Sequence, residues 1–257
     1  MTETSLDKAL RLLDILCAQG RSGVTTLARL SGCPAPTVHR LLAVLARNGY
    51  VTRDPLTREY VLALKFLEMG ARVRNDIPLA SLTMPAMREL MELSGETVNL
   101  VVFEHLEAVY VEQVVNPRSM LLMFTRIGAR APLFCSGVGK AYLATREEAF
   151  IDEYCATVER IRRTRHTIVE ETALRQELCR IRRQGYAVDD EEMEYGVRCV
   201  AALIRRSSNV VLGGISISGP TARVTTDSLS RLGLEVRRAA EEISTGLGCR
   251  DSHTFNP

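Results

Sequence analysis

The chain has 257 residues, of which 46% are hydrophobic and 25% charged, and its 33 Lys and Arg against 31 Asp and Glu leave a net charge of +2. This composition predicts an ordinary globular chain with one small and one medium-sized domain. No apolar run approaches the roughly 20 residues of a membrane-spanning helix, and no export signal opens the chain, so we expect a cytoplasmic protein without a membrane partner. Seven cysteines without a Cys-x-x-Cys pair argue against a disulfide framework and a structural zinc site, and we expect no metal.

Residues 5–19 are predicted to form the first helix, with Ser5 as its cap and Gly20 as its stop. Its apolar residues recur at helical spacing: Leu6, Leu10, Leu13, Leu16 and Cys17. A short helix follows from a cap at Thr25, and Gly32 supplies the left-handed residue that ends it.

A longer helix begins in the turn 34–36, where two prolines have dihedral angles that suit a helix start. One stripe of this helix, at positions i, i+3, i+4 and i+7, is apolar and predicts packing on a small core: Val38, Leu41, Leu42 and Leu45. The opposite face is predicted to enter a groove, and it carries Pro36, Arg40, Ala43 and Arg47, flanked by Thr37 and His39.

Two β-prone runs, 50–53 and 59–62, follow the stop at Asn48-Gly49 and enclose the turn 54–58. The order of short helix, turn, longer helix and two-stranded ribbon predicts a winged helix-turn-helix domain over residues 1–62. Arg53 and Arg58 fall near the tip of the ribbon, where they can meet phosphates.

Charge is uneven along the chain. Residues 1–75 carry eleven Lys and Arg against six Asp and Glu, which leaves 22 against 25 for the remainder. The basic excess therefore lies on the candidate DNA-reading domain and favours DNA binding over a helix-turn-helix that serves only for packing. The candidate DNA-contacting residues are Thr26, Ala35, Pro36, Thr37, His39, Arg40, Arg47, Arg53 and Arg58.

Residues 63–78 are predicted to contain a linker helix whose apolar stripe, Leu64, Leu67, Met69 and Ala71, packs on a partner chain or on the chain's own second domain. Residues 79–257 read as alternating helices and strands around an antiparallel sheet, which predicts an α+β sensor domain. Helices are expected at 78–93 with an interruption near Pro85, at 136–144, from 146, at 172–184 with Gly185 as its cap, and at 226–246. Strands are expected at 97–104, 108–115, 120–127, 186–190, 197–205 and 210–218.

Several motifs, in this order, resemble the IclR (isocitrate lyase regulator) family of bacterial transcription factors, and those of the second domain are most similar to the allantoin-pathway repressors within it. They are residues 5–62, Leu93-Ser94-Gly95-Glu96-Thr97-Val98-Asn99, Ser136-Gly137-Val138-Gly139-Lys140-Ala141, residues 185–192 and residues 215–220. The resemblance implies a winged helix-turn-helix, a linker helix and a GAF-like effector-binding domain over 79–257, assembled as a homodimer or a dimer of dimers. It also implies an operator-binding regulator, more often a repressor, that needs no cofactor.

The resemblance further implies that the second domain binds a small organic-acid effector, glyoxylate-like or another short carboxylate. The implied effector-binding set is the backbone of Gly137 and Val138 with the side chains of Asp189, Cys199, Ser216 and Ser218. Ser216 and Ser218 lie two apart on a predicted strand, so their hydroxyls share a face. Val138 and Leu203 replace the smaller Ala and the Pro that many relatives carry, and they add apolar bulk near this site.

Two alternatives use the cysteines. An enzyme would need a thiol nucleophile, such as Cys135 or Cys199, beside a basic partner, and the histidines at 39, 105, 166 and 253 belong to no local motif that supports this, so we expect no catalytic residue. The stronger alternative is a thiol-based redox-sensing regulator that uses Cys135 or Cys199 in place of a metabolite.

Overall fold

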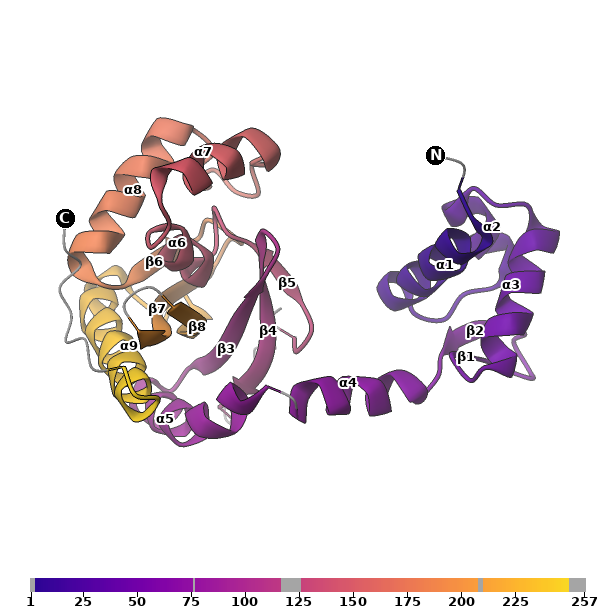
Figure 1. Ribbon diagram of the computed structural model, residues 1–257, viewed down its shortest axis with the longest axis horizontal. Helices are drawn as coiled ribbons and strands as arrows, with labels where there is room; N and C mark the ends of the chain where they lie inside the picture. Colours follow the sequence, from indigo (N-terminus) through magenta and orange to yellow (C-terminus); the bar gives the residue numbers. More distant parts are fainter. Residues whose placement is uncertain (1–2, 76, 117–125, 208–209, 250–257) are drawn as a thin grey trace. The chain divides into compact units, whose positions relative to one another are not determined.

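The computed structural model describes residues 3–75, 77–116, 126–207 and 210–249, and the chain divides into two units, Met1–Ile77 and Pro78–Pro257 (Figure 1). The first unit contains α1 (Ser5–Gln19), α2 (Val24–Ser31), α3 (Ala35–Arg47), β1 (Val51–Arg53), β2 (Tyr60–Leu62) and α4 (Lys65–Asn75). β1 and β2 pair antiparallel. This is the winged helix-turn-helix expected from the sequence.

The core of the first unit lies between α1, α2 and α3. Leu12, Leu27, Val38 and Leu42 are completely buried in it, which confirms the apolar stripe predicted for α3. The stripe predicted for α1 is wrong in part, because Leu6 and Leu10 are 68% and 51% exposed. α1 buries Leu16, as predicted, and Leu12, which the predicted stripe did not include. The leucines of α1 therefore cover two faces of the helix, and only one of these faces meets α2 and α3.

The helix ends follow local hydrogen bonding. α1 is capped by Thr4 and not by Ser5, because the Thr4 hydroxyl accepts the Asp7 amide at 3.2 Å and the Asp7 carboxylate accepts the Thr4 amide at 2.8 Å. α2 begins after Gly23, so Thr25 lies inside the helix and the predicted cap there is wrong. Gly32 ends α2 at φ +69, the left-handed conformation that was expected.

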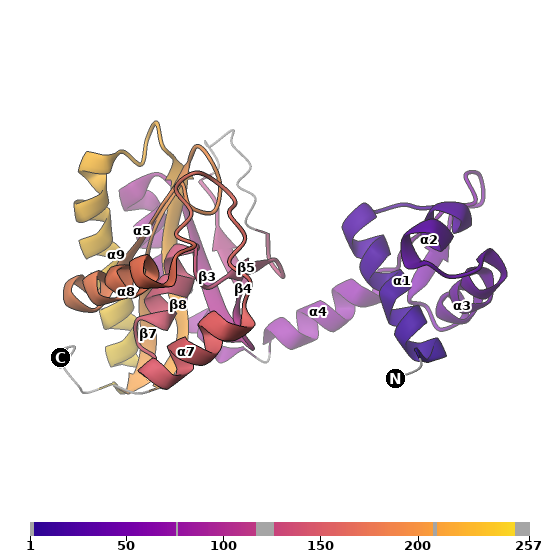
Figure 2. The same cartoon turned by 90° about the horizontal axis from the view of Figure 1, so that it is seen from above.

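The second unit is built on one six-stranded antiparallel sheet in the order β5-β4-β3-β8-β7-β6. Its strands are β3 (Thr97–Glu104), β4 (Glu107–Val114), β5 (Arg130–Pro132), β6 (Ala187–Asp190), β7 (Val197–Ser207) and β8 (Val210–Pro220). Its helices are α5 (Pro78–Ser94), α6 (Gly137–Leu143), α7 (Glu148–Thr157), α8 (Glu171–Gln184) and α9 (Thr226–Gly246). α5 and α9 pack together against the sheet (Figure 2). α6 packs against β4, β6, β7 and β8, and α8 packs on α6. The α+β class is confirmed.

Two predicted features of this unit need correction. α5 is continuous through Pro85, although a proline lacks the amide donor of a regular helix. Met87 and Leu90, just beyond the proline, are almost completely buried, and this packing stabilises the helix across the missing hydrogen bond. The strand predicted at 120–127 lies outside the described residues up to 125, and the short strand β5, which was not predicted, follows it.

In the described part of the chain no helix is long and apolar enough to cross a membrane.

Candidate functional site

The first candidate site is the exposed side of α3. Ala35, Pro36, His39, Arg40 and Arg47 are exposed there, whereas Thr26 of α2 and Thr37 are half-buried. No side chain caps the first turn of α3, and this turn contains no acidic residue. Its backbone amides and the side chains beside them are therefore available to a phosphate or a base edge.

The wing is organised by Asp54. The amides of Leu56 and Thr57 donate to its carboxylate at 2.9 and 3.0 Å, and Arg21 forms an ion pair with it. These donors hold the pKa of Asp54 below its ordinary value. Arg21 lies beside the bridge between Ser22 and Tyr60, and sequence reasoning missed it because its neighbour in the fold is 33 residues away.

The two predicted wing arginines differ in their surroundings. Arg53 donates from Nε to the Arg58 carbonyl at 3.2 Å and lies over the Tyr60 ring, so it is held along the ribbon. Arg58 has φ +64 at the turn, and its side chain is exposed. The geometry therefore presents Arg58 at the tip and Arg53 on the flank of the wing.

The second candidate site is a set of polar side chains that crosses the sheet of the second unit. Asp189 on β6 is opposite Cys199 on β7, and Cys199 is opposite Ser218 on β8. Ser216 lies two residues before Ser218, so all four side chains share one face of the sheet. Three strands thus bring together the four side chains of the effector-binding set.

α6 brings the backbone of that set to the same face. A Cβ atom at Gly137 would lie 3.2 Å from the Cys199 sulfur and 3.7 Å from the Asp189 amide nitrogen, so glycine allows the close approach of α6 to β6 and β7. The Gly139 amide donates to the Ser136 hydroxyl and the Lys140 amide to the Ser136 carbonyl. The amides of Gly137 and Val138 come first in the helix, where the α-helical pattern supplies no acceptor.

The side chain of Val138 is buried against β8. A Cβ atom at Gly214 would overlap the Cγ2 methyl of Val138 and would lie 3.4 Å from the Leu203 side chain. The apolar bulk of Val138 and Leu203 is therefore accommodated at Gly214, next to the polar set.

Sequence reasoning did not assign Asn99, Gln113 or Tyr110 to this site. Asn99 is opposite both Ser216 and Gln113 in the sheet, and its side chain is completely buried. Tyr110 packs against the core that contains Cys135, Val138 and Cys199, and burial raises the pKa of its hydroxyl. Asn99 belongs to a motif noted above, but its partners follow from strand order, which the sequence does not display.

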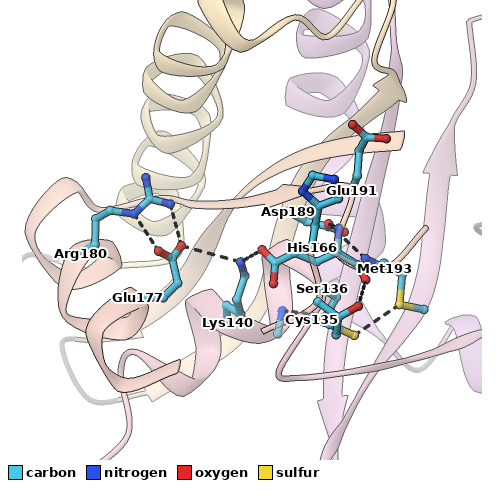
Figure 3. Close-up of polar contacts among 12 residues, drawn as sticks. Cys135, Ser136, Lys140, His166, Glu177, Arg180, Asp189, Glu191 and Met193 are labelled. Carbon is cyan, nitrogen blue, oxygen red and sulfur yellow. Dashed lines mark hydrogen bonds and ion pairs between the residues drawn. The ribbon is translucent and has the colours of Figure 1, made fainter. Parts of the chain in front are cut away.

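A buried charge cluster lies next to Asp189 of the polar set (Figure 3). Lys140 is completely buried and forms ion pairs with Glu192 and, at 3.7 Å, with Glu177, whose carboxylate also binds Arg180. Among the described residues, Glu192 Oε2 is one of the two buried side-chain atoms that lack a hydrogen-bond partner. Burial raises the pKa of Glu192 to about 7, although the Lys140 charge acts in the opposite direction.

Asp189 connects the cluster to the polar set. One oxygen of its carboxylate accepts the backbone amides of Glu192 and Met193 at 2.7 and 3.3 Å. Burial raises the pKa of Asp189 to about 6, against the opposing effects of Lys140 and these amides. The site thus contains an acid that changes its charge near neutral pH.

The cysteines of the site are buried. Burial raises the pKa of Cys135 and of Cys199 to about 12, so both are protonated thiols at neutral pH. Of the histidines, His39, His105 and His166 are exposed, and His253 is outside the described residues. This environment disfavours thiolate chemistry. Among the described residues, no group of three or more His, Cys, Asp or Glu could hold a metal ion.

Comparison with known families accounts for both units. Residues 5–55 match the family described as IclR helix-turn-helix domain, and residues 71–245 match the family described as bacterial transcriptional regulator IclR C-terminal. A winged helix-turn-helix with such a second domain defines a DNA-binding transcriptional regulator. The chain belongs to the IclR family of bacterial transcriptional regulators.

Curated relatives are similar over nearly the whole chain. The regulator KdgR of Escherichia coli is 34% identical and the match covers 96% of this chain and 95% of KdgR. The transcriptional repressor IclR of Escherichia coli is 33% identical (95% and 90%), and the repressor AllR of Salmonella typhi is 34% identical (96% and 90%). These relatives are named as transcriptional regulators or repressors. This protein is likewise a transcriptional regulator and not an enzyme.

Solved structures share the fold. The IclR protein of Thermotoga maritima has a TM-score of 0.77 at 31% identity, with 95% of this chain and 98% of that chain covered. An IclR homologue of Microbacterium hydrocarbonoxydans, solved in complex with 4-hydroxybenzoate, has a TM-score of 0.81 at 22% identity, with 95% and 99% covered.

Proposed function

We propose that the protein binds a DNA operator in the cytoplasm, most simply as a repressor, and that a short carboxylate bound by the second domain controls this binding. In this proposal residues 1–62 form the DNA-binding domain and residues 63–78 the linker helix. Residues 79–257 bind the effector and assemble the oligomer. One observation carries the proposal, namely that Gly137, Asp189, Cys199, Ser216 and Ser218, from four elements, meet on one face of a sheet.

The chemistry of this face suits a carboxylate whose molecule also bears a hydroxyl or carbonyl oxygen. The hydroxyls of Ser216 and Ser218 and the amides of Gly137 and Val138 are donors that an anion requires. Asp189 accepts from a ligand hydroxyl when it is ionised and donates when it is protonated. Val138 and Leu203 narrow the face near Gly214, which favours a compact acid such as glyoxylate.

Apolar surface on the first unit supports a further contact in the assembly, in addition to the contacts of the second domain. Leu6 and Leu10 of α1 are exposed, and Leu64, Leu67 and Val73 in and next to α4 are 82%, 71% and 64% exposed. Monomeric proteins rarely expose so many large apolar side chains in a short stretch. We propose that these side chains are covered in a homodimer or a dimer of dimers, whose two-fold symmetry matches a pseudo-palindromic operator.

The test begins with the effector. A thermal-shift panel of glyoxylate, pyruvate, glycolate and 4-hydroxybenzoate identifies an acid that binds the folded protein, because such a ligand raises the melting temperature by mass action. An operator selected from random duplexes then reports, by gel shift, whether that acid changes DNA binding. We expect a melting shift that is much smaller in the variant Ser216→Ala/Ser218→Ala, which keeps the Gly137 and Val138 amides, with operator binding unchanged. A panel without any response contradicts the effector proposal.

Cysteine oxidation is the competing signal, and the burial of Cys135 and Cys199 disfavours it. Cys135→Ser and Cys199→Ser should leave the operator response to mild peroxide as it is in the parent protein. Loss of a peroxide response in either variant would support the redox alternative.

A further inference from the structure

Two side-chain amides, on β4 and β3, form a hydrogen-bonded line that ends at the two serines on the same face of the sheet. Gln113 Nε2 on β4 donates to Asn99 Oδ1 on β3 at 3.0 Å. Asn99 Nδ2 donates to the hydroxyl oxygens of Ser218 and Ser216 on β8 at 3.3 and 3.5 Å. Gln113 is half-buried, whereas Asn99, Ser216 and Ser218 are buried, so water does not compete along most of this line.

The direction of these hydrogen bonds determines what the serines can do. An amide side chain has one acceptor end and one donor end, and the acceptor end of Asn99 is occupied by Gln113. Its NH₂ group must therefore face the serines. Each serine oxygen accepts from this group, and each hydroxyl proton points elsewhere. Cys199 on β7 is opposite Ser218 and is the neighbour on the other side of the serines, and its sulfur is only a weak acceptor.

We propose that Gln113 and Asn99 are positioning residues that make Ser216 and Ser218 obligatory donors, so that the site selects an ionised carboxylate over its neutral amide. This inference rests on the proposed function, in which these serines contact the effector. An ionised carboxylate is an acceptor only, so each of its two oxygens can accept from one serine hydroxyl. A primary amide has one oxygen and one NH₂ group, and the NH₂ protons would be placed against the proton of a donor hydroxyl. The selectivity for charge then arises from hydrogen-bond direction and not from a cation that touches the ligand.

Donor hydroxyls at Ser216 and Ser218 would offset the repulsion between a bound anion and the Asp189 carboxylate. Asp189 lies on the same face and, when ionised, repels an anion. Lys140 forms its ion pairs with Glu192 and Glu177, which lie beside the polar set. Fixed donors on the serine side therefore have to supply part of the attraction, and buried hydrogen bonds to a charged group are among the stronger ones in proteins.

The test reverses the donor-to-acceptor direction of the hydrogen bonds from residue 113 to the serines and leaves the serines unmutated. In Gln113→Glu, the ionised carboxylate at position 113 can only accept, so Asn99 turns its NH₂ group toward that carboxylate and its oxygen toward the serines, which then donate to Asn99. Gln113→Met introduces a neutral residue of similar length, which removes the hydrogen bond to Asn99 Oδ1 without reversing its direction. Binding of glyoxylate, pyruvate, glycolate and 4-hydroxybenzoate, and of the primary amide of each, is measured by calorimetry on the full chain.

We expect the acid-to-amide affinity ratio to fall by at least tenfold in Gln113→Glu and by a smaller factor in Gln113→Met. Below the pKa of the new carboxyl group the ratio should recover, because the protonated carboxyl at position 113 donates to Asn99 as glutamine does. A residue that only supports packing would lower the melting temperature of both variants and leave the ratio unchanged, and that result would overturn the inference.

A double-mutant cycle separates hydrogen-bond direction from simple charge repulsion. In the background Ser216→Ala/Ser218→Ala, Gln113→Glu should have little further effect on acid binding. An equal effect in both backgrounds assigns the loss to the added charge and overturns the inference. If the serine variant itself binds acids like the parent protein, the proposed function fails. If the serine variant binds acids more weakly than the parent and both Gln113 variants keep the parent ratio, only the inference fails.

Discussion

The Cγ2 methyl of Val138 on α6 occupies the space that a side chain at position 214 of β8 would need. This contact couples the helix that carries the Gly137 and Val138 amides to the strand that carries the effector-binding serines. A change at either residue should therefore alter both the stability of the second domain and its effector affinity.

Gly214→Ala should destabilise the protein by about 1–3 kcal/mol, because the new methyl group overpacks a buried contact. It should also weaken effector binding by moving α6 away from the sheet. The pair Val138→Ala/Gly214→Ala should restore much of both properties, since the loss of the two Val138 γ-methyl groups makes room for the new methyl at position 214 and leaves the contact one methyl smaller. Chemical denaturation and calorimetry measure the two effects, and a pair that is no better than Gly214→Ala would show that the contact does not position α6.

Effector binding should depend on pH through Asp189. Its pKa of about 6 lies above the value of about 3.9 for an unfolded chain. The stability that protonation contributes is therefore present below about pH 4 and lost as the pH rises through 6. A bound anion favours the protonated carboxyl further, so binding should take up a proton and acid affinity should fall between pH 6 and 8.

Asp189→Asn tests this dependence, because asparagine keeps the acceptor for the Glu192 and Met193 amides and has no charge to titrate. Calorimetry in buffers of different ionisation enthalpy should give proton uptake for the parent protein and none for the variant. Equal uptake in both proteins would assign the proton to another group.

Lys140→Met should destabilise the second domain by roughly 3–5 kcal/mol at pH 8, because it leaves Glu192 buried without its cation. The Lys140 charge lowers the pKa of Glu192, so in the variant this pKa rises above the parent value of about 7, and the loss should shrink as the pH falls toward 7. Lys140→Met/Glu192→Gln is the matched variant and should recover much of the loss. Thermal unfolding at pH 5.5 and 8 measures both, and a loss that is the same at the two pH values would contradict this account of the cluster.

Arg40→Ala and Arg47→Ala should weaken operator binding, since both side chains are exposed on α3. A lost phosphate contact lowers affinity for every sequence and reduces the salt slope by roughly one unit, whereas a lost base contact relaxes specificity at one position. Arg183→Ala removes the same charge from α8, outside the DNA-reading unit, and is the control. If both α3 variants bind like this control, α3 is not the recognition helix.

Leu10→Glu and Leu67→Glu should shift the protein toward smaller assemblies, because each places a charge in apolar surface that we expect to be covered. Leu56→Glu, at a 91% exposed position on the wing, is the control. Sedimentation velocity at equal protomer concentrations reports the change. An unchanged oligomer in all three variants would exclude α1 and α4 from assembly.

The parts of the fold that depend on local chemistry were predictable. Gly32 and Gly185 end α2 and α8 in the left-handed conformation, as expected, and the stripe at Val38 identified α3. The helix through Pro85 was not predictable, because the packing that stabilises it comes from distant residues. The same holds for the site: resemblance pointed to Ser216, but the role of Asn99 depends on a strand pairing between residues 117 positions apart.

The order of the strands also constrains how the protein can be made. β8 is the last strand of the described sheet in sequence, yet it lies between β3 and β7 and joins the two halves of the sheet. A chain that is still on the ribosome and has not reached Pro220 therefore contains a complete DNA-reading unit and two unconnected parts of a sensor. Because the pairings of β8 with β3 span more than 100 residues, sensor formation should be the slow step in folding. Newly made molecules would contain a folded DNA-reading unit before they can respond to a metabolite.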